Sequence, residues 1–292
     1  MHQIITAEFI APQIKKFIVA APLIAHKRQP GQFVILRVWE KGERIPLTIV
    51  DGDPAQGTIT LIVQGIGKTT RHLNLLSAGD YIHDLVGPLG RPTHIDKFGL
   101  TVCVSGGVGT AEALPIAKAL KQAGNQVIAI VGARQRELII CESEMRAVCD
   151  EVLISTDDGS YGIKGFVTQV LQDLLQRHRP DFILAVGPLP MMAAVAEQTR
   201  PFGIKTMVSL NSIMVDGTGM CGGCRATVAD KTVFVCVDGP EFDGHQVDFA
   251  EIGRRQRQFV EFEAQALQEF EQTPPPVHHC RLSDQLNPLA EE

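Results

Sequence analysis

The sequence predicts an α/β protein that also contains an all-β part. The first hundred residues read as short strands separated by turns, whereas the residues after Gly99 alternate between buried strands and helices. A later segment concentrates glycine and cysteine. We therefore expect an antiparallel β-barrel in residues 1–98, a parallel α/β domain in 99–206, a small cysteine module in 207–250, and a C-terminal helix and tail in 251–292.

The N-terminal part has the pattern of a β-barrel. Phe33–Val38 is apolar and β-branched, and Thr58–Val63 alternates between polar and apolar side chains. Asp51–Pro54 and Gly87–Gly90 carry turn signals. Evenly spaced short strands of this kind are typical of a small antiparallel barrel.

The segment after Gly99 has the pattern of a parallel sheet. Leu100–Val104 is a continuous apolar run, as expected of a strand that is buried on both faces. Similar runs recur at 127–131, 151–155 and 182–186, and a helix-like stretch at 111–122 follows the first run. Strands that alternate with helices predict a Rossmann-like parallel α/β domain.

The C-terminal part begins with a charged stretch, Phe249–Glu271, which we expect to be helical. Thr273–Pro276 should end it, because proline cannot continue a helix. The last sixteen residues read as a tail that needs a partner surface to become ordered.

Composition narrows the class of protein. Of the 292 residues 45% are hydrophobic, which is ordinary for a globular protein, and the formal charge of −6 argues against a nucleic-acid-binding surface. No apolar run of about 18 residues predicts a membrane-spanning helix, and no signal peptide opens the chain. We expect a cytoplasmic protein that does not enter the membrane.

Glycine-marked loops follow three of the predicted strands. Ser105–Thr110 lies between a strand and a helix, where glycines let the backbone approach a pyrophosphate and the helix N-terminus favours its charge. The alternative is a tight turn without a ligand, since the full G-x-G-x-x-G pattern is missing. Loops after the third and fourth strands lie where open parallel sheets bind ligands. The candidate dinucleotide residues are Gly106, Gly107, Val108, Gly109, Asp157, Asp158, Gly159, Gly187 and Pro188.

Three clustered cysteines indicate a metal site. Asp216, Cys221, Cys224 and Cys236 reproduce the C-x4-C-x2-C…C spacing of plant-type ferredoxins, with a carboxylate in the first position. This spacing predicts a [2Fe–2S] cluster. One alternative is a zinc site with Asp216 or His245 as the fourth ligand; another is that Asp216 only caps a turn.

The order of these motifs resembles the ferredoxin–NADP reductase superfamily, within the branch of dihydroorotate dehydrogenase electron-transfer subunits. The segments that carry the resemblance are Arg44–Thr48, Gly65–Thr70, Gly87–Gly90, the Ser105 loop, Asp157–Gly162, Val215–Arg225 and Cys236–His245. In that branch the cysteine module is most similar to small subunits of NADH-dependent reduced ferredoxin:NADP oxidoreductases, also called sulfide dehydrogenase beta subunits. Dihydroorotate-type subunits instead place a cysteine where Asp216 stands.

The resemblance implies that the barrel holds FAD. Arg44 would neutralise the pyrophosphate and Thr48 would lie near the isoalloxazine, although Arg44 could instead pair with Glu40 or Glu43 at the surface. A second pyrophosphate loop would donate N–H and hydroxyl groups. The implied FAD residues are Arg44, Pro46, Leu47, Thr48, Gly67, Lys68, Thr69 and Thr70.

The resemblance also implies an activity. Hydride would pass directly between NAD(H) and FAD without a general base, and single electrons would leave through the cluster. The acceptor would be a larger FAD and iron–sulfur flavoprotein subunit of the glutamate-synthase small-subunit type, in an electron-bifurcating assembly. Arg134 and Arg136 leave the choice between NAD and NADP open, because either could meet a 2′-phosphate.

Two other readings remain. The same chemistry could serve a dihydroorotate dehydrogenase catalytic subunit or a sulfide or polysulfide reductase. A protein of another class, a zinc-stapled dinucleotide-binding module without turnover, would be colourless.

Overall fold

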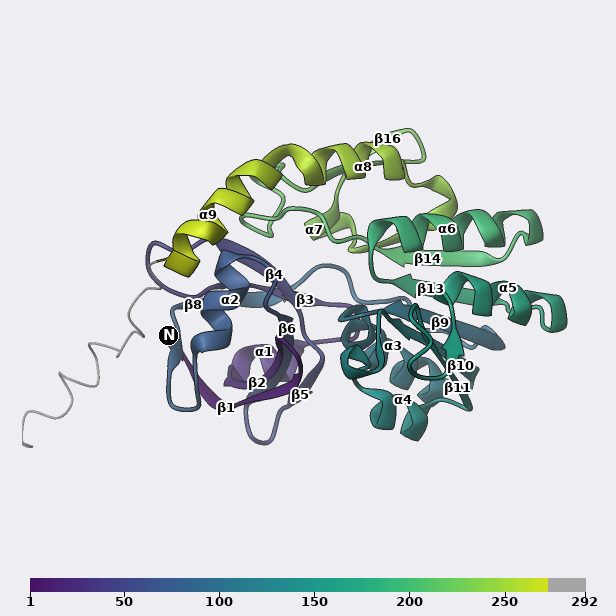
Figure 1. Cartoon of the computed structure of the whole chain (residues 1–292), viewed down its shortest axis with the longest axis horizontal. Helices are drawn as coiled ribbons and strands as arrows, with labels where there is room; N and C mark the ends of the chain where they lie inside the picture. The colour runs from purple at the N-terminus through teal and green to yellow at the C-terminus, as the bar shows by residue number, and fades with distance from the viewer. Residues whose placement is uncertain (273–292) are drawn as a thin grey trace, which may run out of the picture.

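The chain folds into a barrel and an α/β domain that are bridged by its C-terminal part. The computed structural model describes residues 1–272. Figure 1 shows the barrel and the α/β sheet side by side, with the last helices crossing above both. No helix among the described residues is long and apolar enough to cross a membrane.

The barrel consists of two antiparallel sheets around one core. A five-stranded sheet has the order β5-β6-β2-β1-β7, and a three-stranded sheet has the order β4-β3-β8. In the alternating strand β6, Ile59, Leu61 and Val63 point into the core, as the side-chain period of two requires. The elements are β1 (His2–Ala11), β2 (Ile14–Ala20), α1 (Pro22–Lys27), β3 (Phe33–Arg37), β4 (Arg44–Thr48), β5 (Asp51–Asp53), β6 (Thr58–Gln64), α2 (Lys68–Leu75), β7 (Tyr81–Ile82) and β8 (Asp84–Leu89).

Two predicted turns are misplaced. Asp51–Asp53 forms strand β5, with the turn at residues 54–57, and Gly87–Leu89 continues strand β8. Both strands lie at the edge of their sheets. An edge strand tolerates aspartate and glycine, and it tolerates Pro88 because one side of its backbone needs no ladder hydrogen bond.

The α/β domain is built on a seven-stranded sheet of order β12-β11-β10-β9-β13-β14-β17. All of its strand pairs are parallel except the last, β14 with β17. The elements of the domain are β9 (Leu100–Gly106), α3 (Gly109–Gln122), β10 (Gln126–Ala133), α4 (Glu142–Val148), β11 (Glu151–Thr156), β12 (Ile163–Lys164), α5 (Val167–Arg177), β13 (Phe182–Val186), α6 (Leu189–Thr199) and β14 (Lys205–Ser209).

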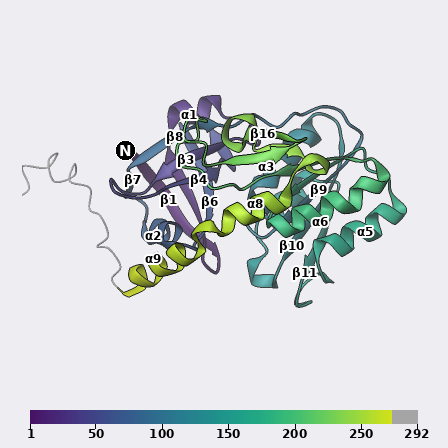
Figure 2. The ribbon, with the colours of Figure 1, turned by 90° about the horizontal axis from the view of Figure 1, so that it is seen from above.

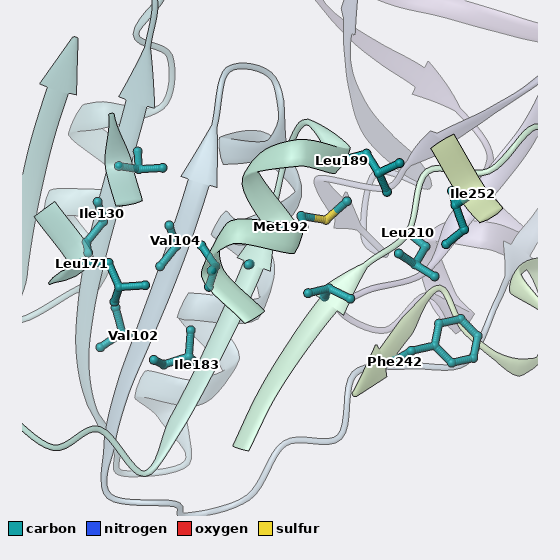
Figure 3. Close-up of a cluster of buried hydrophobic side chains, with 14 of the residues drawn as sticks. Val102, Val104, Ile130, Leu171, Ile183, Leu189, Met192, Leu210, Phe242 and Ile252 are labelled. Atoms are coloured by element: carbon teal, nitrogen blue, oxygen red, sulfur yellow. The ribbon is translucent and has the colours of Figure 1, made fainter. Parts of the chain in front are cut away.

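Helices cover both faces of this sheet, which explains its continuous apolar strands. Val102, Val104 and Ile130 pack on one face against α5 and α6 (Figure 3). Cys103 and Val127 face the other side and pack with α3. The strands are therefore buried on both faces, as the sequence predicted.

The cysteine segment is joined to the same sheet. After β15 (Arg225–Val228), β16 (Lys231–Phe234) and α7 (Val235–Asp238), strand β17 (Glu241–Asp243) pairs antiparallel with β14. Phe242 is buried in the core beneath α6 and α8 (Figure 3). Strand β14 also continues to Ser209, beyond the expected boundary at residue 206.

The stretch predicted as helical forms two helices joined by a short 3₁₀ turn. They are α8 (Phe249–Gln256) and α9 (Val260–Gln272). Figure 2 shows them running from the α/β domain to the barrel. There α9 lies against α2 through an ion pair of Arg71 with Glu271 and a ring contact of His72 with Phe270. The predicted helix stop and tail lie outside the described residues.

Candidate functional site: an interdomain cavity and a cysteine loop

A cavity of about 950 Å³ opens between the barrel and the α/β sheet. Its walls come from strand β4 and from the loops at the carboxyl ends of the parallel strands, which meet at one edge of the sheet. The predicted residues that line it are Pro46, Leu47, Thr48, Gly106, Gly107, Val108, Gly109, Asp157, Gly187 and Pro188. Segments far apart in the sequence thus meet around one space.

The first glycine loop needs its glycines for geometric reasons. Gly107 has φ +58° and donates its N–H to the carbonyl of Gly132 at 2.8 Å. A Cβ on Gly109 would lie 2.5 Å from the carbonyl oxygen of Val186, which is backbone and cannot move aside. The loop therefore brings bare backbone and the N-terminus of α3 to the cavity, as a pyrophosphate requires.

The loop after β11 lies partly in the cavity wall and partly at the protein surface. Asp157 lines the cavity, whereas Asp158 and Gly159 lie outside its wall. Asp158 accepts hydrogen bonds from the backbone and hydroxyl of Ser160, and these bonds lower the pKa of its carboxyl. Asp158 thus shapes the loop that presents Asp157.

The predicted FAD residues of the barrel form two adjacent segments. Arg44 opens strand β4 at the surface, and within residues 1–272 it forms neither of the ion pairs with Glu40 or Glu43 that were its alternative. Glu43 instead accepts a hydrogen bond from the hydroxyl of Thr69, at the start of α2. This bond ties the Arg44 segment to the Gly67–Thr70 loop, and it leaves the guanidinium available to an anion.

The segment Gly67–Thr70, where α2 begins, is preorganised although it lies outside the cavity wall. Thr70 Oγ1 accepts hydrogen bonds from the N–H groups of Gly67 at 3.0 Å and Ile66 at 3.1 Å. Ile66 lines the cavity. Gly67, Lys68, Thr69 and Thr70 therefore lie at its rim, where the first N–H groups of α2 have no partner within the helix.

Glu112 is a site residue that the sequence reasoning missed. It lines the cavity, accepts a hydrogen bond from Thr48 Oγ1 at 3.2 Å, and accepts another from the hydroxyl of Ser209. Desolvation raises the pKa of this half-buried carboxyl, although the two hydroxyl groups oppose the shift. Its one signal in the sequence was a lone charge in the otherwise apolar first half of α3.

A second half-buried carboxyl lies nearby. Glu241 accepts a hydrogen bond of 2.5 Å from the hydroxyl of Thr93, in the connection between barrel and sheet. Desolvation raises its pKa to about 7, and repulsion from Glu112 contributes to the shift. Neither Glu241 nor Thr93 belongs to a recognisable sequence pattern.

The four predicted metal ligands lie together as two pairs. The sulfur atoms of Cys224 and Cys236 are 3.3 Å apart, and Cys221 Sγ lies 3.3 Å from Asp216 Oδ1. A [2Fe–2S] cluster needs two ligands on each of two irons, so two pairs suit it. His245, one alternative fourth ligand for a zinc site, instead shares a hydrogen bond with the hydroxyl of Thr199.

Asp216 also organises the loop around these ligands. Its carboxylate accepts hydrogen bonds from the backbone N–H groups of Thr218, Met220 and Cys221. Desolvation acts to raise its pKa, but the hydrogen bonds from Thr218 and Cys221 outweigh it and hold the pKa at about 2. The turn-capping role is therefore observed, and it keeps an ionised oxygen beside Cys221.

Barrel, dinucleotide-type sheet and intervening cavity together define a protein of the ferredoxin–NADP reductase class, extended by an iron–sulfur module. Residues 211–248 match the iron–sulfur cluster binding domain of dihydroorotate dehydrogenase B. The solved structure of phthalate dioxygenase reductase shares the fold, with a TM-score of 0.57 at 18% identity over 81% of this chain and 94% of that one.

Two relatives are much more similar. The electron transfer subunit homolog of dihydroorotate dehydrogenase B (NAD(+)) from Thermotoga maritima is 45% identical over 94% of this chain and 96% of its own length. A chain in the solved structure of the NADH-dependent reduced ferredoxin-NADP oxidoreductase is 44% identical over 93% of this chain and 98% of that one, with a TM-score of 0.88. The chain belongs to the family of dihydroorotate dehydrogenase B electron transfer subunits and their homologs.

Proposed function

We propose that this chain is the electron-transfer subunit of an NAD(P)H-dependent oxidoreductase. It exchanges hydride between NAD(H) and FAD, and it passes single electrons through a [2Fe–2S] cluster to a larger flavoprotein subunit. The observation that carries this proposal is the combination, in one chain, of the interdomain cavity with a loop of two ligand pairs.

The residues present fit a flavin and a dinucleotide in the cavity. FAD supplies the exchange between a two-electron hydride donor and one-electron acceptors. The part of the protein is to bind and orient these groups. Arg44 and the Gly67–Thr70 segment would hold the FAD pyrophosphate, and Pro46–Thr48 would hold the flavin. The Gly106–Gly109 loop, Asp157, and Gly187 with Pro188 would hold the nicotinamide dinucleotide.

The cysteine loop fits the cluster. Asp216 and Cys221 would hold one iron, and Cys224 and Cys236 the other. Burial raises the pKa of the Cys236 thiol, and the adjacent Cys224 adds to the shift, so binding of iron has to displace that proton. The thiols of the loop are unpaired, which suits a reducing compartment, and we place the protein in the cytoplasm.

We further propose that the acceptor is a flavoprotein subunit of the glutamate-synthase small-subunit type, in an electron-bifurcating assembly. Similarity to a chain of the ferredoxin-NADP oxidoreductase whose structure addresses flavin-based electron bifurcation supports this partner. A dihydroorotate dehydrogenase catalytic subunit is the second candidate, because residues 211–248 match that family's cluster domain. Asp216 favours the first, since dihydroorotate-type subunits have cysteine there.

The test is an ultraviolet–visible spectrum of anaerobically purified protein, with flavin, iron and zinc assays on the same sample. We expect flavin bands, two irons per chain, and bleaching of both chromophores by NADH. Zinc without flavin would overturn the proposal in favour of a binding module. Identifying the subunit that co-purifies with this chain then distinguishes the two candidate partners. A subunit that oxidises dihydroorotate would contradict the electron-bifurcating assembly.

A further inference from the structure

Two half-buried carboxyls, Glu112 and Glu241, lie where barrel, sheet and cysteine segment meet. Glu112 reaches the FAD cavity from α3 and bonds to Thr48 of the barrel. Its other oxygen accepts from Ser209, and Ser209 is the cross-strand partner of Glu241 in the β14–β17 pair. Ser209 therefore links the two acids: its hydroxyl bonds to Glu112, and its backbone lies opposite Glu241 in the sheet.

The surroundings of Glu241 are built to hold it. Thr93 donates its hydroxyl at 2.5 Å, and the N–H of Thr93 is fixed on the carbonyl of Pro30 at 2.9 Å. Gly31 has no Cβ because one would lie 2.2 Å from Thr93 Oγ1 and 2.9 Å from Glu241 Oε1. The side chain of Glu241 thus reaches from β17 to the connection between the two domains, where Thr93 and Gly31 fit closely around its carboxyl group.

Within residues 1–272, no cation forms an ion pair with either acid. The other groups around Glu241 are Cys103 of β9 and Asp243 on its own strand, which lies near His245. Burial raises the pKa of the Cys103 thiol, and Cys149 and Glu241 add smaller contributions. Arg91, in the same connection as Thr93, is engaged by Asp238 at 3.3 Å. Hydroxyls, a thiol and a further acid therefore lie around the pair, and no ion pair among the described residues neutralises it.

Two acids in such a place do not titrate independently. Ionisation of one disfavours ionisation of the other, and a further negative charge nearby raises both pKa values. Burial and the repulsion from Glu112 already bring the pKa of Glu241 to about 7. A modest change of charge in the cavity is then enough to add or remove a proton at neutral pH.

We propose that Glu112 and Glu241 act as one proton-binding pair, which takes up a proton when negative charge is added in the FAD cavity and releases it when that charge leaves. The inference rests on the proposed function. A hydride from NADH adds one negative charge to the FAD site, and one proton from water converts a carboxylate of the pair to the acid. When the two electrons leave through the cluster, the proton that the hydride brought to the flavin and the proton held by the pair both return to water.

The test is an infrared difference spectrum of the holoprotein, reduced minus oxidised, near neutral pH. We expect the C=O band of a protonated carboxyl to appear on reduction, and to be lost in Glu241→Gln. The matched control is Glu8→Gln, because Glu8 is an exposed acid of β1 whose side chain is 63% exposed, and it should keep the band. The FAD midpoint potential should also depend less steeply on pH in Glu241→Gln than in the wild type or the control.

Each result is decisive. A wild-type spectrum without the band, or a band and a pH slope that Glu241→Gln leaves unchanged, would overturn the pair. If Glu241→Gln fails to bind FAD, the conservative variant Glu241→Asp decides instead. A shifted band in Glu241→Asp supports the pair, and an unshifted band overturns it. Absence of flavin from the wild type would instead defeat the proposed function, so the two failures are distinguishable.

Discussion

Thr48, the last residue of a barrel strand, donates a 3.2 Å hydrogen bond to Glu112 in a helix of the other domain. The bond connects the two walls of the cavity. Replacing Thr48 with valine leaves a buried carboxyl oxygen without that donor, which should lower the free energy of unfolding by about 1–3 kcal/mol. Urea unfolding of the cofactor-free protein measures this, and Thr48→Ser should be close to wild type. Equal losses in both variants would show that the bond is not what stabilises the site.

Arg44 is expected to bind the FAD pyrophosphate. Loss of its charge-assisted hydrogen bonds in Arg44→Ala should weaken FAD binding by about tenfold or more, since such bonds contribute about 1.5–3 kcal/mol. Fluorescence titration of the apoprotein with FAD gives the dissociation constant. Arg28→Ala is the control, because Arg28 is held by Asp51. Unchanged affinity in Arg44→Ala would place the pyrophosphate elsewhere.

Cys224 is expected to be a cluster ligand. Cys224→Ala should abolish the cluster absorbance and most of the bound iron while FAD remains, because one iron would retain a single protein ligand. Absorbance and iron content measure the outcome, and Cys149→Ala, a half-buried cysteine after α4, should keep the full cluster. A Cys224→Ala protein with normal iron would contradict the ligand set.

Asp216 is expected to supply an oxygen ligand. Asp216→Cys should keep a cluster but change its midpoint potential, because thiolate and carboxylate donate differently to iron. Potentiometric titration followed by electron paramagnetic resonance gives the value. Asp216→Asn retains an acceptor for the loop N–H groups without the charge, so it separates loop folding from ligation. A potential that stays the same in Asp216→Cys would mean that Asp216 only caps the turn.

Glu241 should make stability depend on pH. Its folded-state pKa is raised from 4.5 to about 7, so between these values the folded chain binds more protons than the unfolded chain. Stability contributed by this group is then fully present below about pH 4.5 and is lost as pH rises towards 7, by on the order of 3 kcal/mol. Denaturant titrations of apoprotein across this range should show a flatter profile for Glu241→Gln. Parallel profiles for the two proteins would contradict the raised pKa.

The sequence predicted those features that depend on local pattern. Leu100–Val104 was recognisable as a buried strand because it is apolar throughout, and the cysteine spacing marked its loop without any contact being known. Edge strand β5 was missed because an edge position removes the usual penalty on aspartate and glycine. Glu112 was missed because its meaning depends on Ser209, which lies 97 positions later and meets it only through the sheet topology.

Strand β17 has a consequence for any attempt to move the cluster segment between proteins. Because β17 completes the sheet beside β14, a chain cut after Ser209 would bare the β14 edge and withdraw Phe242 from the core. An uncovered edge strand invites pairing with other chains. The segment that holds the predicted cluster therefore depends on the α/β domain for its fold. If it were transferred to another protein without that domain, we expect it to aggregate rather than transfer electrons.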